Sequence, residues 1–442
     1  MLDNVRFFND DEDQRFDNSR ILGNSQDQYF SSVRWKHLLK DGFFSVSLGR
    51  TFVDYSFLQS DSLLNPVFLS DSKEGETSLR ADAVFLLDRS LELSFGAQGK
   101  RALIEGDFAW TPSSDSYGEE PQIANLSNQW DTTGYKANAY VQLARNFFTR
   151  LRLTVGARLD YFSLIENPVV IGPRASARYG LTDVTTLTAS GGTYYQSPSY
   201  IWLMSNPANT GLDHVRVDQL VLGFEHLLRS DLRVRVEGYV KDYRDYPASS
   251  ERPWLVLANT GAGFGGEENG FDAFGFDNLL SVGTGSAQGV ELLVQKRLSD
   301  IPLYGIFSLS YNQTEYTAID GATRAGQYDQ RIILNLSGGW KINEVWEISA
   351  KFRYGTGTPY TPFLSDGSRD YTADYNSDRL PEFHSLDFRA DLPDCYQQRG
   401  QRLAIAVLGL GAAHAASLFP VGACTTPGSP PATGKTDRRI SG

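Results

Sequence analysis

Strict alternation of apolar and polar side chains constrains this chain more than any other feature, and it is clearest from Thr149 to Tyr161. From Leu151 onward the odd positions carry apolar residues, whereas the even positions carry Arg, Thr, Gly or Asp. A period of two places successive side chains on opposite faces of a strand. The pattern persists for about eleven residues, the length of a tilted strand that spans a membrane. One face of this strand is therefore expected to be apolar and the other wet.

The same alternation recurs along most of the chain, in segments that are joined in pairs by short turns. Residues 232–243 and 345–354 show it well, because Leu, Val, Ile and Phe alternate there with Arg, Glu, Lys and Ser. We predict about fifteen strands, which form hairpins. These strands cover residues 31–39, 43–57, 78–87, 91–103, 135–144, 151–161, 173–180, 184–194, 217–226, 232–243, 289–297, 303–314, 332–340, 345–354 and 383–390.

The links between the predicted strands are asymmetric in length. Links within a pair have about two to six residues, as expected of hairpin turns. Links between pairs are long and polar, and they cover residues 58–77, 104–134, 195–216, 244–288 and 355–382. Short turns at one end and long loops at the other are typical of outer-membrane barrels. Compact soluble domains rarely carry several long loops without secondary structure.

Aromatic residues near the strand ends fit the same interpretation. Tyr and Trp gather at the lipid–water boundaries of membrane proteins, although aromatic residues are also common in strands of any kind. We predict two girdles, one at each boundary. The candidate girdle residues are Trp35, Tyr135, Tyr161, Tyr194, Tyr195, Trp340, Trp346 and Tyr354.

Composition excludes a helical membrane protein and argues against a nucleic-acid partner. The mean hydropathy is −0.33, and the strand-rich body lacks the long apolar run that a spanning helix needs. A barrel gives only every second residue to lipid, so a low average is compatible with it. The net charge of −12 opposes binding to nucleic acid. Both cysteines, Cys395 and Cys424, follow the strand-rich body, and a body without cysteine suits the bacterial periplasm and outer membrane.

The composition changes abruptly after Asp391. Residues 403–419 are rich in Ala, Gly and Leu and do not alternate, and residues 420–442 are rich in Pro, Gly and Thr. A short membrane helix, a disordered extension and a reading frame that slipped near Leu392 are three interpretations. We favour the third, because the predicted strand 383–390 is otherwise left without a hairpin partner. Translation of the other frames past residue 391 is then expected to restore alternating strands that end in an aromatic residue.

Three parts follow from this division. Residues 1–30 are acidic and rich in Asn, Asp and Gln, and we expect a polar N-terminal loop segment there. We expect residues 31–391 to form the β-barrel and residues 392–442 to form an aberrant or disordered tail, for which an out-of-frame origin is the favoured interpretation. The first residues contain no basic stretch followed by an apolar stretch, so an export signal is absent from them.

Few motifs indicate any other chemistry. Gly261–Gly266 fit G-x-G-x-x-G, but no helical period follows them, as a dinucleotide site requires, so we interpret them as a flexible external loop. His37, His214, His226, His384 and His414 lack the spacing of a zinc site, and no Ser/His/Asp set has catalytic spacing. We therefore assign no catalytic, metal-binding or cofactor-binding residues and do not expect an enzyme.

Two kinds of loop residue remain as candidates for ligand binding. Acidic clusters at 10–13 and 267–277 carry ligands suited to Ca²⁺, but solvated loop charge explains them more simply. Aromatic residues in the long loops either line a ligand vestibule, where their faces stack on sugars or planar chelates, or pack within the loops. These residues are Tyr200, Trp202, Trp254, Phe271, Phe274 and Phe276. Because the alternatives are balanced, we assign no ligand-binding residue.

Several segments in order resemble the C-terminal barrel of TonB-dependent outer-membrane receptors. The strand pair that ends in Gly156-Ala-Arg-Leu-Asp-Tyr is similar to a strand pair of that family. The segments beginning at Pro173, Gly289, Asp329, Phe352 and Leu380 resemble the hairpins that follow it. Each motif is weak alone, but their order over roughly 135–391 makes the resemblance fairly specific.

The resemblance implies an all-β, antiparallel, up-and-down transmembrane barrel in the outer membrane of a Gram-negative bacterium. It also implies energised uptake of a scarce nutrient (a metal chelate, cobalamin or a glycan) with the TonB complex as partner and outer-membrane lipid around the wall. The family barrel has 22 strands and a plug. We find no plug domain, TonB box or final strands in the sequence, and therefore expect a fragment. The alternatives are a passive outer-membrane channel or structural barrel and, less favoured, a soluble β-rich carbohydrate-binding protein or hydrolase.

Overall fold

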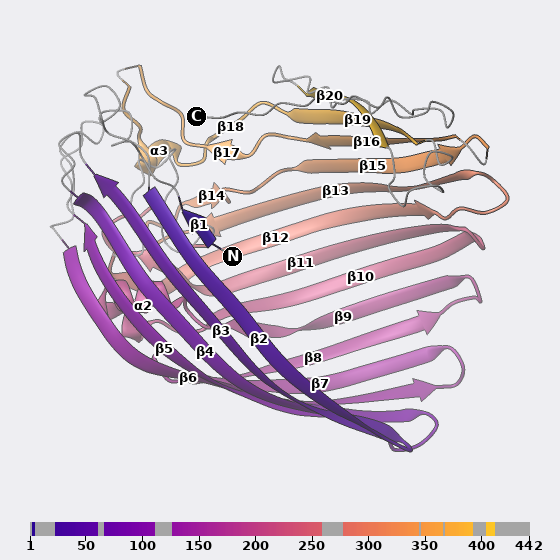
Figure 1. Cartoon of the computed structure of the whole chain (residues 1–442), viewed down its shortest axis with the longest axis horizontal. Coiled ribbons are helices and arrows are strands. Elements are labelled where there is room, and N and C mark those ends of the chain that lie inside the picture. The colour runs from indigo at the N-terminus through magenta and orange to yellow at the C-terminus, as the bar shows by residue number, and fades with distance from the viewer. Residues whose placement is uncertain are drawn as a thin grey trace, which may run out of the picture.

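The computed structural model describes residues 2–4, 23–60, 66–110, 126–258, 277–343, 346–365, 367–391 and 404–411. Antiparallel strands dominate this part of the chain (Figure 1). The strands are β1 (Leu2–Asn4), β2 (Gly23–Leu39), β3 (Gly42–Ser60), β4 (Pro66–Leu86), β5 (Leu91–Trp110), β6 (Leu126–Phe147), β7 (Leu151–Phe162), β8 (Val169–Gly180), β9 (Thr185–Gln196), β10 (Val215–Arg229), β11 (Leu232–Ser249), β12 (Leu279–Lys296), β13 (Leu303–Thr317), β14 (Thr323–Ala325), β15 (Ile332–Lys341), β16 (Glu347–Gly355), β17 (Pro359–Tyr360), β18 (Asp378–Arg379), β19 (Phe383–Asp391) and β20 (Ala404–Gly411). The helices are α2 (Tyr200–Ser205), the 3₁₀ helix η1 (Pro207–Gly211) and α3 (Tyr371–Asp374).

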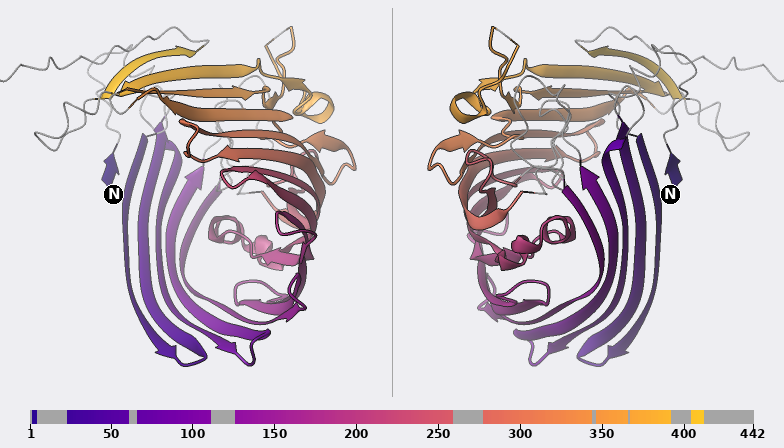
Figure 2. Two further views of the ribbon diagram at one scale, coloured as in Figure 1. Left: turned by 90° about the vertical axis from the view of Figure 1, so that its right-hand side faces the viewer. Right: turned by 90° about the vertical axis from the view of Figure 1, so that its left-hand side faces the viewer.

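Within the described residues, sixteen strands form one up-and-down meander, where the sequence predicts about fifteen strands in hairpins. Each strand from β2 to β13 pairs antiparallel with the next, and the order continues through β15, β16, β19 and β20. Strand β1 adds a short pairing to β2, and β17 pairs with β18 in a separate ribbon. The sheet curves strongly but is not closed within the described residues (Figure 2).

The outer face of the curved sheet carries the predicted apolar rows. On β7, Leu153, Val155 and Leu159 are exposed, and Leu220, Leu222 and Phe224 are exposed on β10. Because the period is two, the residues between them face the inside of the curve. The candidate girdle residues Trp35, Tyr135, Trp340 and Trp346 are each about half exposed, whereas the ring of Tyr194 packs beneath Arg174. Among the described residues, no helix is long and apolar enough to cross a bilayer.

The short turns and the long links lie at opposite ends of the sheet, as predicted (Figure 1). The predicted loops, however, were too long. Strands β3 and β4 continue through much of 58–77, and β5 and β6 extend far into 104–134. At about 3.3 Å per residue, the 21 residues of β4 reach well beyond the thickness of a bilayer. The extensions were missed because their outer faces are polar, which hides the alternation.

The two ends of the described chain also differ from the strand predictions. Strand β2 begins at Gly23, ahead of the predicted start at residue 31. Strand β20 lies in the part of the chain that was assigned to the tail, and it pairs antiparallel with β19 from Asp391↔Ala404 to Ser385↔Gly411. The expectation that the strand at 383–390 has no hairpin partner is therefore wrong.

A compact core lies inside the curve at the end with the long links (Figure 2). The α2 segment contributes Tyr200, Leu203 and Met204, which pack against apolar residues of the wall and of the neighbouring links. The rest of the core is Ala102, Ile104, Phe108, Phe162, Ile165, Leu212, Leu255, Leu257 and Leu279. This core fixes the long links relative to the wall, and it therefore positions the candidate site.

Candidate functional site at the end with the long links

Tyr200 anchors α2 to the inner face of the wall. Its ring packs edge-on against Phe162 at the end of β7, with 5.8 Å between centroids. Its hydroxyl donates to Glu76 Oε1 of β4 at 2.9 Å, and Lys136 Nζ lies 3.9 Å from the centre of its ring. Burial beside Glu76 raises the pKa of Tyr200 above its usual range, so the phenol stays a hydrogen-bond donor. The segment is thus held to three strands by one side chain.

A buried polar cluster joins the β9–β10 link to the β11–β12 link. Asn209 of η1 donates through Nδ2 to the Asp277 carbonyl at 3.1 Å and accepts at Oδ1 from the Leu279 amide at 2.8 Å. The Asp277 carboxylate accepts from Arg252 Nη1 at 2.6 Å and from Ser249 Oγ at 2.5 Å. Burial outweighs these partners and raises the pKa of Asp277 to about 6. We call Asn209, Ser249, Arg252 and Asp277 the loop latch.

Aromatic rings from two long links meet beside this latch. Trp254, which follows β11, stacks on Tyr371 of α3 with 4.9 Å between centroids, and Tyr375 lies 4.6 Å from it in a tilted arrangement. Trp254 and Tyr375 line a shallow cleft together with Tyr316 of β13 and Arg324 of β14. We call this the aromatic cleft. The cleft is small, about 20 Å³, and one face of Trp254 is covered by Tyr371, so it offers an aromatic surface and not an enclosing pocket.

The charge of the cleft is balanced by its own residues. Arg324 Nη2 lies 2.7 Å from Asp320 Oδ2 and also donates to the Thr372 carbonyl at 2.7 Å. The guanidinium is therefore committed to the loops, and Arg324 orders the cleft more than it adds free positive charge. Its hydrogen bond to Thr372 ties β14 to α3 and so fixes one wall of the cleft against the other.

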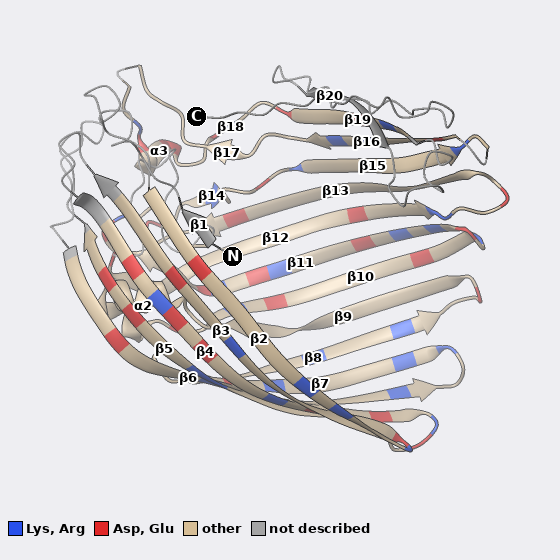
Figure 3. Cartoon of the chain, viewed as in Figure 1, with Lys and Arg blue, Asp and Glu red and all other residues tan. Residues whose placement is uncertain are grey.

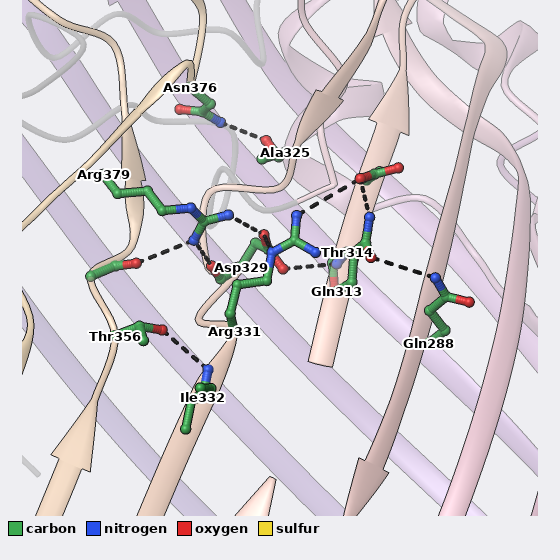
Figure 4. A network of polar contacts seen from close by, with 12 residues as sticks. Gln288, Gln313, Thr314, Ala325, Asp329, Arg331, Ile332, Thr356, Asn376 and Arg379 are labelled. Carbon is green, nitrogen blue, oxygen red and sulfur yellow. Dashed lines mark hydrogen bonds and ion pairs between the residues drawn. The ribbon is translucent and has the colours of Figure 1, made fainter. Parts of the chain in front are cut away.

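Asp329 is the centre of a polar network that holds the last described long links together (Figure 4). Its side chain is fully buried, and Oδ1 accepts from the Thr314 amide of β13 at 2.8 Å. Oδ2 lies 2.9 Å from Arg331 Nε and 2.5 Å from Arg379 Nη2. Arg379 also donates to the carbonyls of Asp329 and Gly357 at 2.5 and 3.3 Å. One carboxylate thus joins segments from β13 to β18.

Asn376 completes the connection between these links. It adopts the left-handed conformation with φ 57°, which Asn tolerates better than most residues. In this conformation its Nδ2 donates to the Ala325 carbonyl at 3.0 Å (Figure 4). The turn after α3 is therefore attached directly to β14 at the edge of the aromatic cleft.

The loop aromatics that the sequence singled out have different environments. Tyr200 is in the core, Trp202 packs against it, and Trp254 lines the cleft. Phe271, Phe274 and Phe276 lie outside the described residues, as do Gly261–Gly266 and the acidic cluster at 10–13. Of the acidic cluster at 267–277 only Asp277 is described, and its carboxylate is bound to Arg252 and Ser249.

Several residues of the site were not predicted from sequence. Arg379 and Asn209 gave no signal, and Asp329 was noted only as the start of a segment that resembles the family, because isolated polar residues in long links look alike until the links are folded together. Within the described residues, no group of three or more His, Cys, Asp or Glu side chains is placed to hold a metal ion. His214 is buried, and burial lowers its pKa; its Nε2 donates to the Pro168 carbonyl at 3.2 Å.

Comparisons with known proteins agree with this architecture. A family model described as TonB-dependent receptor-like β-barrel matches residues 2–407. Among solved structures, a copper transporter, OprC, matches with a TM-score of 0.63 at 14% identity, over 88% of this chain and 62% of that chain. A mutant of the ferric enterobactin receptor PfeA from Pseudomonas aeruginosa matches with a TM-score of 0.63 at 15% identity, over 87% and 56% of the respective chains.

A third structure is the ferric-catecholate import receptor Fiu from E. coli K12, with a TM-score of 0.59 at 11% identity, over 87% of this chain and 60% of that one. This chain therefore spans less than two thirds of the length of these structures. No curated protein matches it. At such low identity the structures show the fold, whereas the family model covers most of the chain. The chain therefore belongs to the TonB-dependent receptor-like β-barrel family.

Proposed function

We propose that this chain is the barrel wall of an outer-membrane receptor that takes up a scarce nutrient with energy from the TonB complex. One observation carries the proposal most directly. The sheet exposes apolar rows on its outer face, while a built platform of long links lies inside one end. An apolar outer face suits lipid, and an ordered platform at the end of a barrel suits a ligand that enters there.

The charge distribution supports the orientation of the barrel. Asp and Glu gather on β2–β6 toward the end with the long links, beyond the apolar rows (Figure 3). On β5 and β6 the exposed outer positions change from Leu103 and Tyr135 to Glu105 and Asp131. Such a change marks the boundary of the hydrocarbon, because charged residues on the lipid face are costly. We place the end with the long links on the outside of the cell.

The nutrient is a metal chelate, cobalamin or a glycan, and the aromatic cleft is its first contact. Neighbouring structures are named as a copper transporter and as ferric enterobactin and ferric-catecholate receptors. Trp254, Tyr316 and Tyr375 line this cleft, and the parts of their rings that are not packed on other aromatic residues can contact all three ligand classes. Arg324 is already paired with Asp320, so charge recognition at this cleft is modest.

The membrane part of the proposal is tested by fractionation of the full chain expressed in a Gram-negative host with an export signal added. We expect the protein in the outer-membrane fraction, with a gel mobility that changes on boiling, as folded barrels show. Recovery of a folded protein in the aqueous phase without detergent would instead support a soluble β-rich protein.

The ligand part is tested by tryptophan fluorescence during titration with ferric enterobactin, cobalamin and maltodextrin. We expect one of these probes to bind, and Trp254→Ala to weaken that binding. Trp346→Ala removes the same side chain at the opposite end of the barrel and is the matched control. If both variants bind the probe equally well, the aromatic cleft is not the ligand site. If the protein conducts current across a bilayer but shows no saturable binding, the passive channel is favoured.

A further inference from the structure

Two arginines face each other near the short-turn end of the wall. Arg152 of β7 and Arg178 of β8 are direct register partners in the antiparallel pair. Direct partners project their side chains on the same face, and like charges placed there repel. Both residues line a hollow that also includes Arg150, Thr182 and Thr186. Glu92 balances one of these cations, Arg152, so Arg178 is the charge that remains to be balanced.

The two guanidinium groups lie on the inner face of the curve. Phe162 shares the even positions of β7 with Arg152, and Phe162 packs against Tyr200 of α2, which lies inside the sheet. The odd positions Leu153 and Val155 are exposed on the outer face. The hollow therefore opens to the inside of the curve and not to its apolar outer face.

The acidic groups in the hollow leave Arg178 without a partner. Arg152 is held by Glu92 Oε2 at 3.1 Å, and Arg150 contacts Asp183 Oδ1 at 3.4 Å. Within the part of the chain that the structure describes, no carboxylate or other acceptor is paired with Arg178. Thr188 is the register partner of Arg178 on β9, so a hydroxyl stands on its other side. Guanidinium and hydroxyl donors converge here, and Asp183, which also lines the hollow, contacts Arg150 through Oδ1.

We propose that this hollow is a binding site for an oxoanion, a phosphate or carboxylate group that enters from the lumen. Arg178 supplies a free planar fork, which matches the geometry of such an anion. Arg152, which is paired with Glu92, lies opposite on the neighbouring strand, and Thr186 and Thr188 of β9 supply hydroxyl donors on the same face. This site lies at the other end of the molecule from the aromatic cleft, and it does not depend on which nutrient is taken up.

The experiment uses the full chain folded in detergent and inorganic phosphate as the probe. Saturable broadening of the ³¹P resonance reports binding in the wild type, in Arg178→Gln and in Arg244→Gln. Arg244→Gln is the matched control, because it removes the same charge at an exposed pair with Asp242 near the end with the long links. We expect about tenfold weaker binding for Arg178→Gln, the loss of one bidentate contact, and no change for the control.

Further measurements distinguish a soluble anion from a lipid headgroup, and a loss of binding from a failure to fold. Citrate should compete with phosphate, whereas vesicles of phosphatidylglycerol should not, because the hollow faces the lumen. Arg178→Lys keeps the charge and should bind with intermediate strength; it also replaces Arg178→Gln if that variant fails to fold. Equal broadening in all variants, broadening that does not saturate, or competition by the lipid vesicles alone would overturn the proposal.

Discussion

Arg252 Nη1 lies 2.6 Å from Asp277 Oδ1, and the Asp277 side chain is completely buried. These two residues stand on either side of the β11–β12 link, 25 positions apart in the sequence. Ser249 Oγ donates to the second carboxylate oxygen, and Asn209 binds the Asp277 backbone. The latch therefore holds two long links at once, and its strength depends on the charge state of one carboxyl group.

We predict that the latch is tighter in mild acid. Burial raises the pKa of Asp277 from 3.8 to about 6, so the folded state binds this proton more strongly than the unfolded state does. Stability from this group is fully present below about pH 4 and falls as pH rises to about 6, by at most about 3 kcal/mol. Hydrogen exchange at the Leu279 amide, corrected for the intrinsic rate, should show more protection at pH 5 than at pH 7.5.

Asp277→Asn is the variant that isolates this effect. An amide has nearly the same shape but does not titrate, so the difference in protection between the two pH values should disappear. Asp242→Asn, at an exposed ion pair with Arg244, should leave the difference unchanged. A wild-type protein that is better protected at pH 7.5 would show that the Arg252 ion pair outweighs the cost of burial.

A second prediction concerns the polar network that is centred on Asp329. Asp329→Asn leaves Arg331 and Arg379 facing a neutral group, and breaking a buried pair in this way costs about 3 kcal/mol. We expect faster hydrogen exchange at the Thr314 amide, which donates to Asp329 Oδ1, and faster proteolysis of the β14–β15 link. Asp242→Asn breaks the ion pair with Arg244, in which both side chains are about half exposed. The loss of stability there should stay below about 1 kcal/mol. Similar losses of stability in both variants would show that Asp329 does not hold these links together.

The extent to which the sequence predicted this structure follows from what alternation can and cannot reveal. Strands such as β7 and β11 alternate because one face meets an apolar phase and the other meets water, so their existence and direction were predictable. Strand β20 was missed because Ala404–Gly411 do not alternate. The extensions of β4 and β5 were missed because their outer faces are polar; on the inner face of β5, Ile104 and Phe108 belong to the core and not to a lipid-facing row.

The candidate site was less predictable, for a physical reason. The sequence left Tyr200 equally compatible with a ligand vestibule and with packing inside the loops. Tyr200 is buried because α2 folds back onto Phe162, a contact between residues that are far apart in the sequence. Asp329 and Asn209 act through partners in other links, and no local spacing announces such partners.

A third prediction concerns the anchor of α2. Tyr200→Phe keeps the ring packing against Phe162 but removes the hydrogen bond to Glu76, at a cost of about 1.5–3 kcal/mol for a bond to a charged acceptor. Hydrogen exchange at the Leu203 amide should become faster. Tyr354→Phe removes an exposed hydroxyl that donates to Glu382 at 2.8 Å and should have little effect. If the two variants behave alike, the Glu76 bond does not hold α2.

The last prediction compares adjacent positions on β10. Leu222 is exposed on the outer face at 56% of its surface, and Val221, the next residue along the strand, faces the lumen. Leu222→Arg places a charge in the hydrocarbon, at a cost of about 2–4 kcal/mol near the middle of the bilayer. Val221→Arg places the same charge in water, on the face that already carries Glu225, which pairs with Arg233. Folding into lipid vesicles, followed by gel mobility before and after boiling, should therefore fail more often for Leu222→Arg. Should Val221→Arg prove the more damaging of the two, the outer face does not meet lipid, and the receptor function fails with it.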